Sequence, residues 1–321
     1  MAEQATGGES PTVKSIFVYP VKSCRGVSVS QAGISSTGLR WDRLWMVVNA
    51  ESGRMFTQRV APKLALVQSE LPLGAFSPSW KPNKASFLVM RAPSMNVLKV
   101  PLVEPRAISN GVSIWDWIGS AFDEGEEAAT WFSNYLGKPS RLVRFNEGHM
   151  IIFVDTASET RPVPSAHGVG HTTRFNDVYP FHLISQKSLD ALNELLQEPI
   201  HVDRFRPNFL IDGCEPFSED LWDEIEINGL NFRVGELCYR CKIPTINQET
   251  AVGGSEPKEA LGKFRNDKIL FPNKEKPQGR AYMGTLLVST NFKPDNGNKS
   301  IRVGDPIHVL KTFSSYADCR K

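Results

Sequence analysis

The sequence has few cysteines, no long apolar run and almost no net charge, and each absence excludes a class of protein. Its 321 residues include five cysteines, an odd number that does not resemble the disulfide framework of a secreted domain. No apolar stretch reaches about eighteen residues, so we expect no membrane span. With 37 basic and 35 acidic residues, the net charge of +2 argues against the clustered basic face that nucleic-acid binding needs, and we expect no nucleic-acid partner.

The N-terminus lacks the features of a targeting segment. Residues 1–13, MAEQATGGESPTV, are polar and acidic. They have neither the basic-then-apolar order of a secretory signal nor the arginines of a mitochondrial presequence. We therefore predict a disordered tail over residues 1–12 of a cytoplasmic protein, with a mitochondrial location as the alternative.

Short segments rich in β-branched and aromatic residues dominate the chain and predict a β-rich protein. Turn-forming residues separate these segments, a spacing that is typical of a twisted antiparallel sheet or barrel. The predicted strands are Ser15–Val21, Leu44–Asn49, Ala65–Leu71, Ser86–Arg91, Asn96–Val103, Tyr282–Ser289 and Ile301–Leu310, the last broken by Gly304–Pro306.

Three segments have helical patterns, so the predicted fold class is mixed α/β with strands in excess. Glu124–Leu136 has acids in its first turn and stops at Gly137. Ser185–Gln197 begins with a serine suited to the N-cap and has three leucines on one face. A shorter helix is predicted over Pro257–Phe264.

A polar, proline- and glycine-containing stretch lies between Asp155 and Asn176. A loop of this length inside a compact protein is usually functional or mobile. We place the domain boundary just before it, which predicts one domain over residues 13–150, whose first strands can join the second domain's core, and another over residues 151–315.

The stretch Gly235–Thr245, GELCYRCKIPT, carries two of the five cysteines and allows four interpretations. A structural zinc site at Cys238 and Cys241 would need two further ligands, and no second motif supplies them. A redox dithiol would need a helix after the first cysteine, whereas Lys242–Ile246 is predicted to be extended. Both cysteines can be buried hydrophobes. Alternatively Cys241, between two basic residues, is a thiolate that binds a metal carried by a cofactor.

The turn Val21–Gly26, VKSCRG, follows a predicted strand. Lys22, the Ser23 hydroxyl and the backbone N–H groups of such a turn can hold a phosphate. An ordinary turn with a solvated lysine explains the same residues.

Two arginines are further candidates for binding an anionic group. Arg206 stands between Phe205 and a proline, just before an apolar strand, which suits an arginine aimed at a carboxylate or phosphate. Asn208 follows and offers both a donor and an acceptor. Arg43 and Arg206 can equally be salt-bridged, Arg43 with Asp42 or Asp203.

The order of these motifs resembles the MOSC family. VYPVKSCRG, GLRWDRLWMVV, RFRPNFLI, the RC pair and VGDPIHVL follow one another in the family's order, over roughly Val13–Leu310. Within the family the resemblance is to the amidoxime-reducing component proteins. It implies an N-terminal MOSC-type β-barrel-like domain and a C-terminal MOSC β-barrel domain with a few flanking helices.

The resemblance also implies a molybdenum cofactor, Mo-molybdopterin, with Cys241 as the metal ligand. The family's cofactor contacts fall on Lys22, Ser23, Arg43, Arg206 and Asn208, with Tyr239 and Arg240 just before the ligand. A turn that carries hydroxyl residues in animal members reads Asp177, Val178, Tyr179 here, so only Asp177 matches. Asp177 is also the predicted proton donor or water positioner.

The function implied is reduction of N-hydroxylated compounds, such as amidoximes and hydroxylamines, with electrons from cytochrome b5 and NADH-cytochrome b5 reductase. The loop between Asp155 and Asn176 is predicted to form the rim of the substrate opening. One alternative is a cofactor or sulfur carrier that uses Cys241 as a persulfide; another is a non-catalytic binding protein with zinc at Cys238 and Cys241. The pyridoxal phosphate site of sulfurase members belongs to an upstream domain and is implied only for the family.

Overall fold

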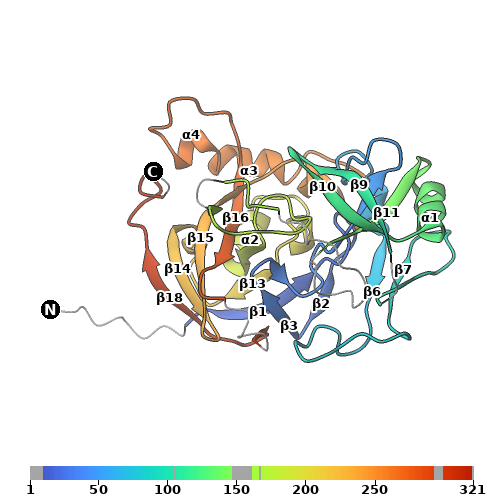
Figure 1. The fold of residues 1–321 in the computed structure, drawn as a ribbon. Helices are drawn as coiled ribbons and strands as arrows, with labels where there is room; N and C mark the ends of the chain where they lie inside the picture. Colours follow the sequence, from blue (N-terminus) through green and yellow to red (C-terminus); the bar gives the residue numbers. More distant parts are fainter. Residues whose placement is uncertain (1–9, 104–105, 147–160, 166–167, 293–298, 320–321) are drawn as a thin grey trace.

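A curled eight-stranded sheet forms one half of the molecule (Figure 1). The computed structural model describes residues 10–103, 106–146, 161–165, 168–292 and 299–319. In pairing order the strands are β18 (Ile307–Thr312), β14 (Trp222–Ile227), β15 (Leu230–Tyr239), β16 (Tyr282–Ser289), β12 (Phe181–Ser185), β13 (Phe209–Asp212), β1 (Thr12–Val18) and β2 (Val27–Val29). All neighbours are antiparallel except β12 and β13, whose almost continuously apolar sequences suit a parallel pair buried on both faces.

Three smaller sheets complete the described part of the chain. The first contains β5 (Trp45–Asn49), β11 (Ser140–Phe145), β10 (Trp117–Asp123) and β9 (Ala107–Ile114), in that order. The others are β17 (Ser300–Arg302) with β3 (Gln31–Ser35) and β4 (Gly38–Leu39), and β6 (Gln68–Glu70) with β7 (Phe87–Arg91) and β8 (Leu98–Pro101). The chain is therefore β-rich, with an N-terminal barrel-type half and a C-terminal half, as predicted.

The described helices are few and short. They are α1 (Glu126–Leu136), α2 (Gln186–Asn193), α3 (Lys258–Phe264) and α4 (Asp267–Leu270), with 3-10 helices over Pro62–Leu66, Val202–Arg204, Ser218–Leu221 and Ile243–Thr245. The three predicted helices are present, although α2 ends at Asn193 rather than at the predicted Gln197. Helix α1 ends at Gly137 in the left-handed conformation, and the Ser185 side chain accepts from the Ser188 N–H to cap α2. No helix in these residues is long and apolar enough to cross a membrane.

Two local predictions were wrong. The predicted strand Ala65–Leu71 begins inside a 3-10 helix, where Pro62 supplies a helical φ at the first position. Lys242–Ile246 is not extended but forms the 3-10 turn Ile243–Thr245, because the ring of Pro244 suits a helical first turn and the Thr245 hydroxyl donates to the Lys242 carbonyl at 2.7 Å. The hairpin of β9 and β10 was not predicted. Most of its residues are not buried, so its sequence lacks a clear alternation of apolar and polar residues.

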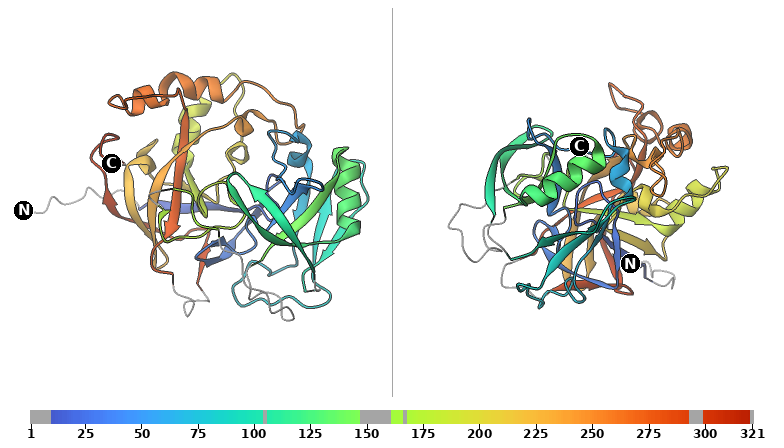
Figure 2. Two further views of the ribbon diagram at one scale, coloured as in Figure 1. Left: turned by 45° about the horizontal axis from the view of Figure 1, so that its top comes forward. Right: turned by 90° about the vertical axis from the view of Figure 1, so that its right-hand side faces the viewer.

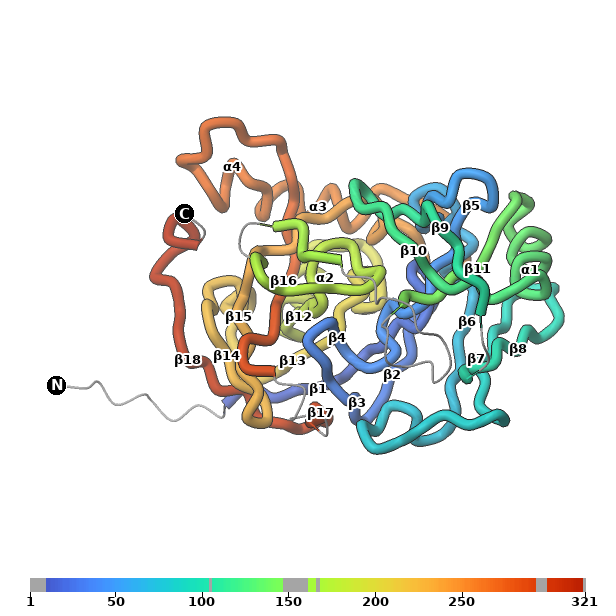
Figure 3. Tube along the Cα trace, viewed as in Figure 1, coloured from blue at the N-terminus to red at the C-terminus, as the bar shows by residue number. Residues whose placement is uncertain are grey.

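The first strands lie beside strands from the C-terminal part of the chain. β1 pairs with β13, Ile16 opposite Phe209, and the chain then crosses to β5 in the other half. The blue N-terminal trace runs between the two halves in Figures 2 and 3. Thr12 already begins β1, while residues 1–9 of the predicted tail and the predicted boundary near residue 150 lie outside the described residues.

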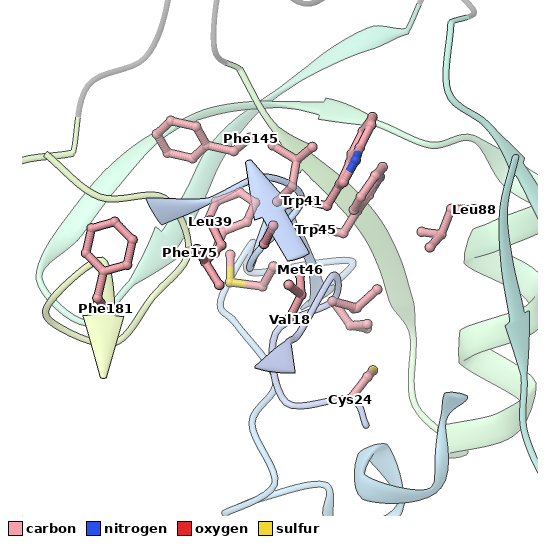
Figure 4. Packing of buried hydrophobic residues seen from close by; sticks show 14 of the residues in the cluster. Val18, Cys24, Leu39, Trp41, Trp45, Met46, Leu88, Phe145, Phe175 and Phe181 are labelled. Carbon is pink, nitrogen blue, oxygen red and sulfur yellow. The ribbon is translucent and has the colours of Figure 1, made fainter. Parts of the chain in front are cut away.

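One apolar core joins the two halves. It includes Trp41 and Trp45, which lie side by side in Figure 4. Their rings stack with centroids 5.9 Å apart and planes 11° from parallel. It also includes Phe145 of β11 and Phe175 near β12, whose rings meet edge to face at 5.2 Å. Because these contacts cross between the halves, each half helps to hold the other in place.

A buried carboxylate anchors this core. Glu124, whose side chain is fully buried, accepts hydrogen bonds at 2.6 Å from Trp45 Nε1 and from Arg144 Nε, and also pairs with Arg106. A buried carboxylate is tolerated only when partners of this kind compensate its lost hydration. Glu124 therefore couples the tryptophan stack to β11.

We expect Glu124→Gln to lower the free energy of unfolding by ~3–5 kcal/mol, because it removes the fully buried charge that pairs with the buried guanidinium groups of Arg144 and Arg106. Glu126→Gln is the matched control: Glu126 pairs with Arg141 but its side chain is 83% exposed, so a change below about 1 kcal/mol is expected. Urea unfolding of both variants measures the difference. Equal losses would contradict the anchoring role of Glu124.

Candidate functional site

The ring of Tyr19 brings two of the predicted arginines together. The guanidinium carbons of Arg43 and Arg206 each lie 4.3 Å from its centroid. Arg43 pairs with both oxygens of Asp42, at 2.8 and 2.6 Å, and donates from Nη2 to the Arg206 carbonyl at 3.0 Å. Asp42 also accepts from the Tyr19 N–H at 2.9 Å, so one carboxylate orders this corner of the site.

Several residues of this corner have left-handed backbone conformations. Ser23, Arg43 and Arg206 have φ values of 68°, 46° and 57°. Each such residue costs about 1 kcal/mol or more, and the surrounding structure must impose it. Conformations of this kind are concentrated at functional sites.

Arg206 has donor capacity that the protein does not use. Its side chain is buried, and its Nη2 is enclosed without a hydrogen-bond partner among the described residues. Burial lowers the pKa of Arg206 from its usual value. A buried guanidinium with an unpaired N–H is suited to an anionic ligand.

The turn at Lys22 is tied to the turn at Asp177. Lys22 Nζ donates to Asp177 Oδ1 at 2.6 Å and to the Phe175 carbonyl at 2.8 Å. Burial lowers the pKa of Lys22 to about 8, although Asp177 opposes the shift. Burial would raise the pKa of Asp177, but Lys22 and Arg59 hold it well below its usual range, so this carboxylate stays ionised.

Arg59, which was not predicted, lies between Asp177 and Cys241. Its Nη2 is 3.7 Å from Asp177 Oδ2, and it is close enough to Cys241 for that side chain to influence the Arg59 pKa. Burial alone would lower the pKa of Arg59, but Asp177 and Cys241 raise it. The sequence around it is only an arginine in a turn, so no local signal distinguishes it from a solvated residue.

Cys241 follows β15 and opens the 3-10 turn, and its sulfur accepts from the Ile243 N–H at 3.4 Å. Cys238, three residues earlier, has a different partner: Arg240 Nη1 donates to its sulfur at 2.7 Å, and Arg240 Nη2 donates to the Phe205 carbonyl at 2.8 Å. Burial raises the pKa of the Cys238 thiol, although Arg240 opposes the shift. The two thiols are therefore chemically distinct.

The described residues hold no ready-made metal centre. They contain no group of three or more His, Cys, Asp or Glu side chains that could hold an ion. The nearby Cys24 is a buried residue, and burial raises its thiol pKa to about 12. A metal at Cys241 would therefore have to bring most of its ligands with it.

Other predicted site residues have side chains engaged in packing. The Asn208 amide is buried, accepting from the His182 N–H and donating to the Phe17 carbonyl, both at 3.2 Å. Tyr179 is buried and fills the space beside Gly235, where a Cβ atom would lie 2.2 Å from its ring. Val178 packs beside it, while Tyr239 is 45% exposed, with Arg280 4.5 Å from its ring centroid.

Arg161 is a second residue that was not singled out. It lies in the predicted loop between Asp155 and Asn176, of which residues 155–160 and 166–167 are outside the described residues. Its Nη1 donates to the carbonyls of Arg174 and Asn176, at 2.8 and 2.6 Å, and its Nη2 to that of Asp177 at 3.0 Å. It thereby shapes the turn that presents Asp177.

Comparison with known proteins shows which family this chain resembles along most of its length. Residues 10–139 match the family described as the MOSC N-terminal beta barrel domain, and residues 170–308 match the MOSC domain. The chain is 32% identical to mitochondrial amidoxime-reducing component 1 of Mus musculus over 93% of this chain and 82% of that one, and 32% identical to that of Homo sapiens over 93% and 83%. It is 30% identical to molybdenum cofactor sulfurase of Danio rerio over 82% of this chain but 32% of that one.

Because the pKa of Lys22 is lowered to about 8 in the folded chain, we predict that the wild type becomes more stable with rising pH, relative to a variant that does not titrate at this position. The folded chain binds its Lys22 proton less tightly than the unfolded chain, whose lysine keeps the ordinary value of 10.5, so this residue's contribution to the free energy of unfolding rises from about pH 8 to 10.5. We expect the wild type to gain ~1–3 kcal/mol over this range relative to Lys22→Arg, which does not titrate.

Urea unfolding at several pH values measures this difference. Lys14→Arg, at a lysine side chain that is 43% exposed and pairs with Asp212, controls for the general effect of replacing lysine by arginine. The prediction is contradicted if the free energies of unfolding of the wild type and Lys22→Arg differ by the same amount at every pH.

Proposed function

Because this chain belongs to the MOSC-domain family, we propose that it is a molybdenum-cofactor oxidoreductase that reduces N-hydroxylated compounds. The substrates are small amidoximes and hydroxylamines, which take up two electrons and two protons to give the amine-type product and water. The observation that carries the proposal is one thiol, Cys241, beside an excess of cationic side chains that the protein itself does not neutralise.

The charges at this site favour an anionic cofactor. Five cations, from Lys22, Arg43, Arg59, Arg206 and Arg240, surround two carboxylates, from Asp42 and Asp177. Among the described residues, Arg206 Nη2 and Arg240 Nε are buried without hydrogen-bond partners. A pterin phosphate would satisfy such donors and balance the charge.

The ligand chemistry points the same way. A single cysteine does not form a metal site, so the metal must arrive with other ligands, as it does in a pterin dithiolene. Cys241 would be the protein ligand, with Lys22, Ser23, Arg43, Arg206 and the backbone near Tyr239 and Arg240 around the pterin. When bound, this cofactor supplies the two-electron chemistry.

The protein's own residues then position charge and protons. Asp177, held ionised by Lys22 and Arg59, acts in this proposal by orienting its neighbours and water rather than as a proton donor. Lys22 keeps its proton at pH 7 and holds it at Nζ, against Asp177. Asn208 contributes by joining β1 to β12 through its amide, and Val178 and Tyr179 through packing and their backbone.

Electrons come from a separate protein. We propose cytochrome b5 with NADH-cytochrome b5 reductase, as the resemblance implies, and a cytoplasmic location. Relatives in Mus musculus and Homo sapiens are named as mitochondrial, and this supports the alternative location.

A second candidate is a sulfur or cofactor carrier, which the similarity to a molybdenum cofactor sulfurase favours. It would hold sulfur on Cys241 and would not turn over hydroxylamines. The zinc alternative, at Cys238 and Cys241, lacks a third ligand among the described residues.

Metal content tests the proposal directly. We expect about one molybdenum per chain in protein made in a host that synthesises the cofactor, and loss of that metal in Cys241→Ala. Cys238→Ala is the matched control and should keep the metal, because its thiol bonds to Arg240 instead. Mass spectrometry measures both.

The other results separate the alternatives. Zinc without molybdenum would remove the enzyme proposal. If molybdenum persists in Cys241→Ala but is lost in Cys238→Ala, the metal ligand is Cys238 rather than Cys241. Molybdenum without reduction of benzamidoxime in the presence of cytochrome b5 and its reductase would favour the carrier.

Arg59 should matter as much as the predicted residues. We expect Arg59→Ala to lower molybdenum content or kcat/KM for benzamidoxime about tenfold or more, because it removes a charge beside both Asp177 and Cys241. Arg54→Ala, at an exposed arginine on the same segment, is the control and should behave as wild type. Equal behaviour of the two variants would show that Arg59 has no part in the site.

A further inference from the structure

The tip of the β9–β10 hairpin extends over the candidate site. The two strands are joined by the turn Trp115–Asp116, with Ile114 opposite Trp117. Figures 1 and 2 show this hairpin reaching from the four-stranded sheet toward the eight-stranded one. A residue at its tip can therefore meet groups that belong to the other half of the molecule.

Trp115 makes such contacts through both its polar edge and its ring. Its Nε1 donates to Asp177 Oδ1 at 3.2 Å, and the Arg59 guanidinium lies 4.8 Å from its ring centroid. Asp177 also binds Lys22, and Arg59 is close enough to Cys241 to interact with it electrostatically. The indole therefore contacts the two side chains, Asp177 and Arg59, that connect Lys22 and Cys241 to this part of the site.

The ring nevertheless remains largely uncovered. Trp115 is 47% exposed, although its N–H and its contact with Arg59 fix its orientation. Its φ of 52° is a left-handed value, and glycine or asparagine is the usual residue at such a hairpin turn. A tryptophan here neither suits the turn nor fills the core, so turn stability and burial do not explain it.

We propose that Trp115 forms a substrate-binding subsite for a flat aromatic group attached to the N-hydroxyl function. This inference rests on the proposed function and names its substrate class. An aromatic ring stacks on the exposed indole while the N-hydroxyl group points past Arg59 toward Cys241. Asp177 and Arg59 hold the indole in place, so that the stacking surface is present before the substrate binds.

Two substrates that share one reacting group test the subsite. Benzamidoxime carries a phenyl ring and acetamidoxime a methyl group. We expect Trp115→Ala to raise KM for benzamidoxime about tenfold and KM for acetamidoxime less than twofold, with kcat and molybdenum content little changed. Trp115→Phe, which keeps a ring but loses the N–H donor, should recover most of the benzamidoxime affinity.

Ile118→Ala is the control on the same hairpin. Ile118 is 71% exposed and is not part of the proposed subsite, so both KM values should stay at the wild-type level. Equal effects of Trp115→Ala on the two substrates would overturn the inference and leave Trp115 as a cover for the Arg59–Asp177 pair. If Trp115→Ala does not fold, the comparison rests on Trp115→Leu, judged by the same ratio of KM values.

Binding without turnover separates this inference from the proposed function. Calorimetric titration of the oxidised protein with each amidoxime, without any electron donor, gives the two Kd values directly. If the wild type reduces neither compound, the proposed function fails. A preference for benzamidoxime that disappears in Trp115→Ala would still support the subsite, and equal binding of both compounds by the wild type would overturn it.

Discussion

The antiparallel pairing of β1 with β13 is the constraint on which the candidate site depends. It sets Ile16 opposite Phe209, and the Phe17 N–H donates to the Asn208 carbonyl at 2.9 Å. This pairing brings the residues that follow β1 into contact with those that precede β13. This is how Tyr19 comes to lie against Arg206, although about 190 positions of sequence separate the two segments.

The cations that meet here outnumber the carboxylates that bind them: Arg43 pairs with Asp42 and Lys22 with Asp177, and backbone carbonyls supply further partners. Arg43, Arg240 and Lys22 each donate to a backbone carbonyl, those of Arg206, Phe205 and Phe175. A carbonyl fixes the direction of a guanidinium or ammonium group without neutralising it, whereas a carboxylate would do both. With two carboxylates among five cations, the site keeps a positive potential suited to an anionic group.

Strained backbone conformations are also found around the site. Of the nine described non-glycine residues with positive φ, four lie around the site, while others such as Ser94 and Asn228 lie in turns elsewhere; the four are Ser23, Arg43, Arg206 and Trp115. The apolar core, with Trp41 and Trp45 stacked and Glu124 anchored beneath them, supplies the stability that offsets this cost. The rigid part of the fold therefore supports a corner that would not hold its shape alone.

The sequence by itself determined the fold class, the main helices and the family, because apolar alternation, helix caps and short motifs act over a few neighbouring residues. It also singled out Lys22, Arg43, Arg206 and Cys241. Only the tertiary structure decided which residues surround them: Arg59, Arg161 and Trp115 have no local signal, and each reaches Asp177 from a different part of the chain. Such contacts depend on how distant strands pair, and no periodicity within a segment records that pairing.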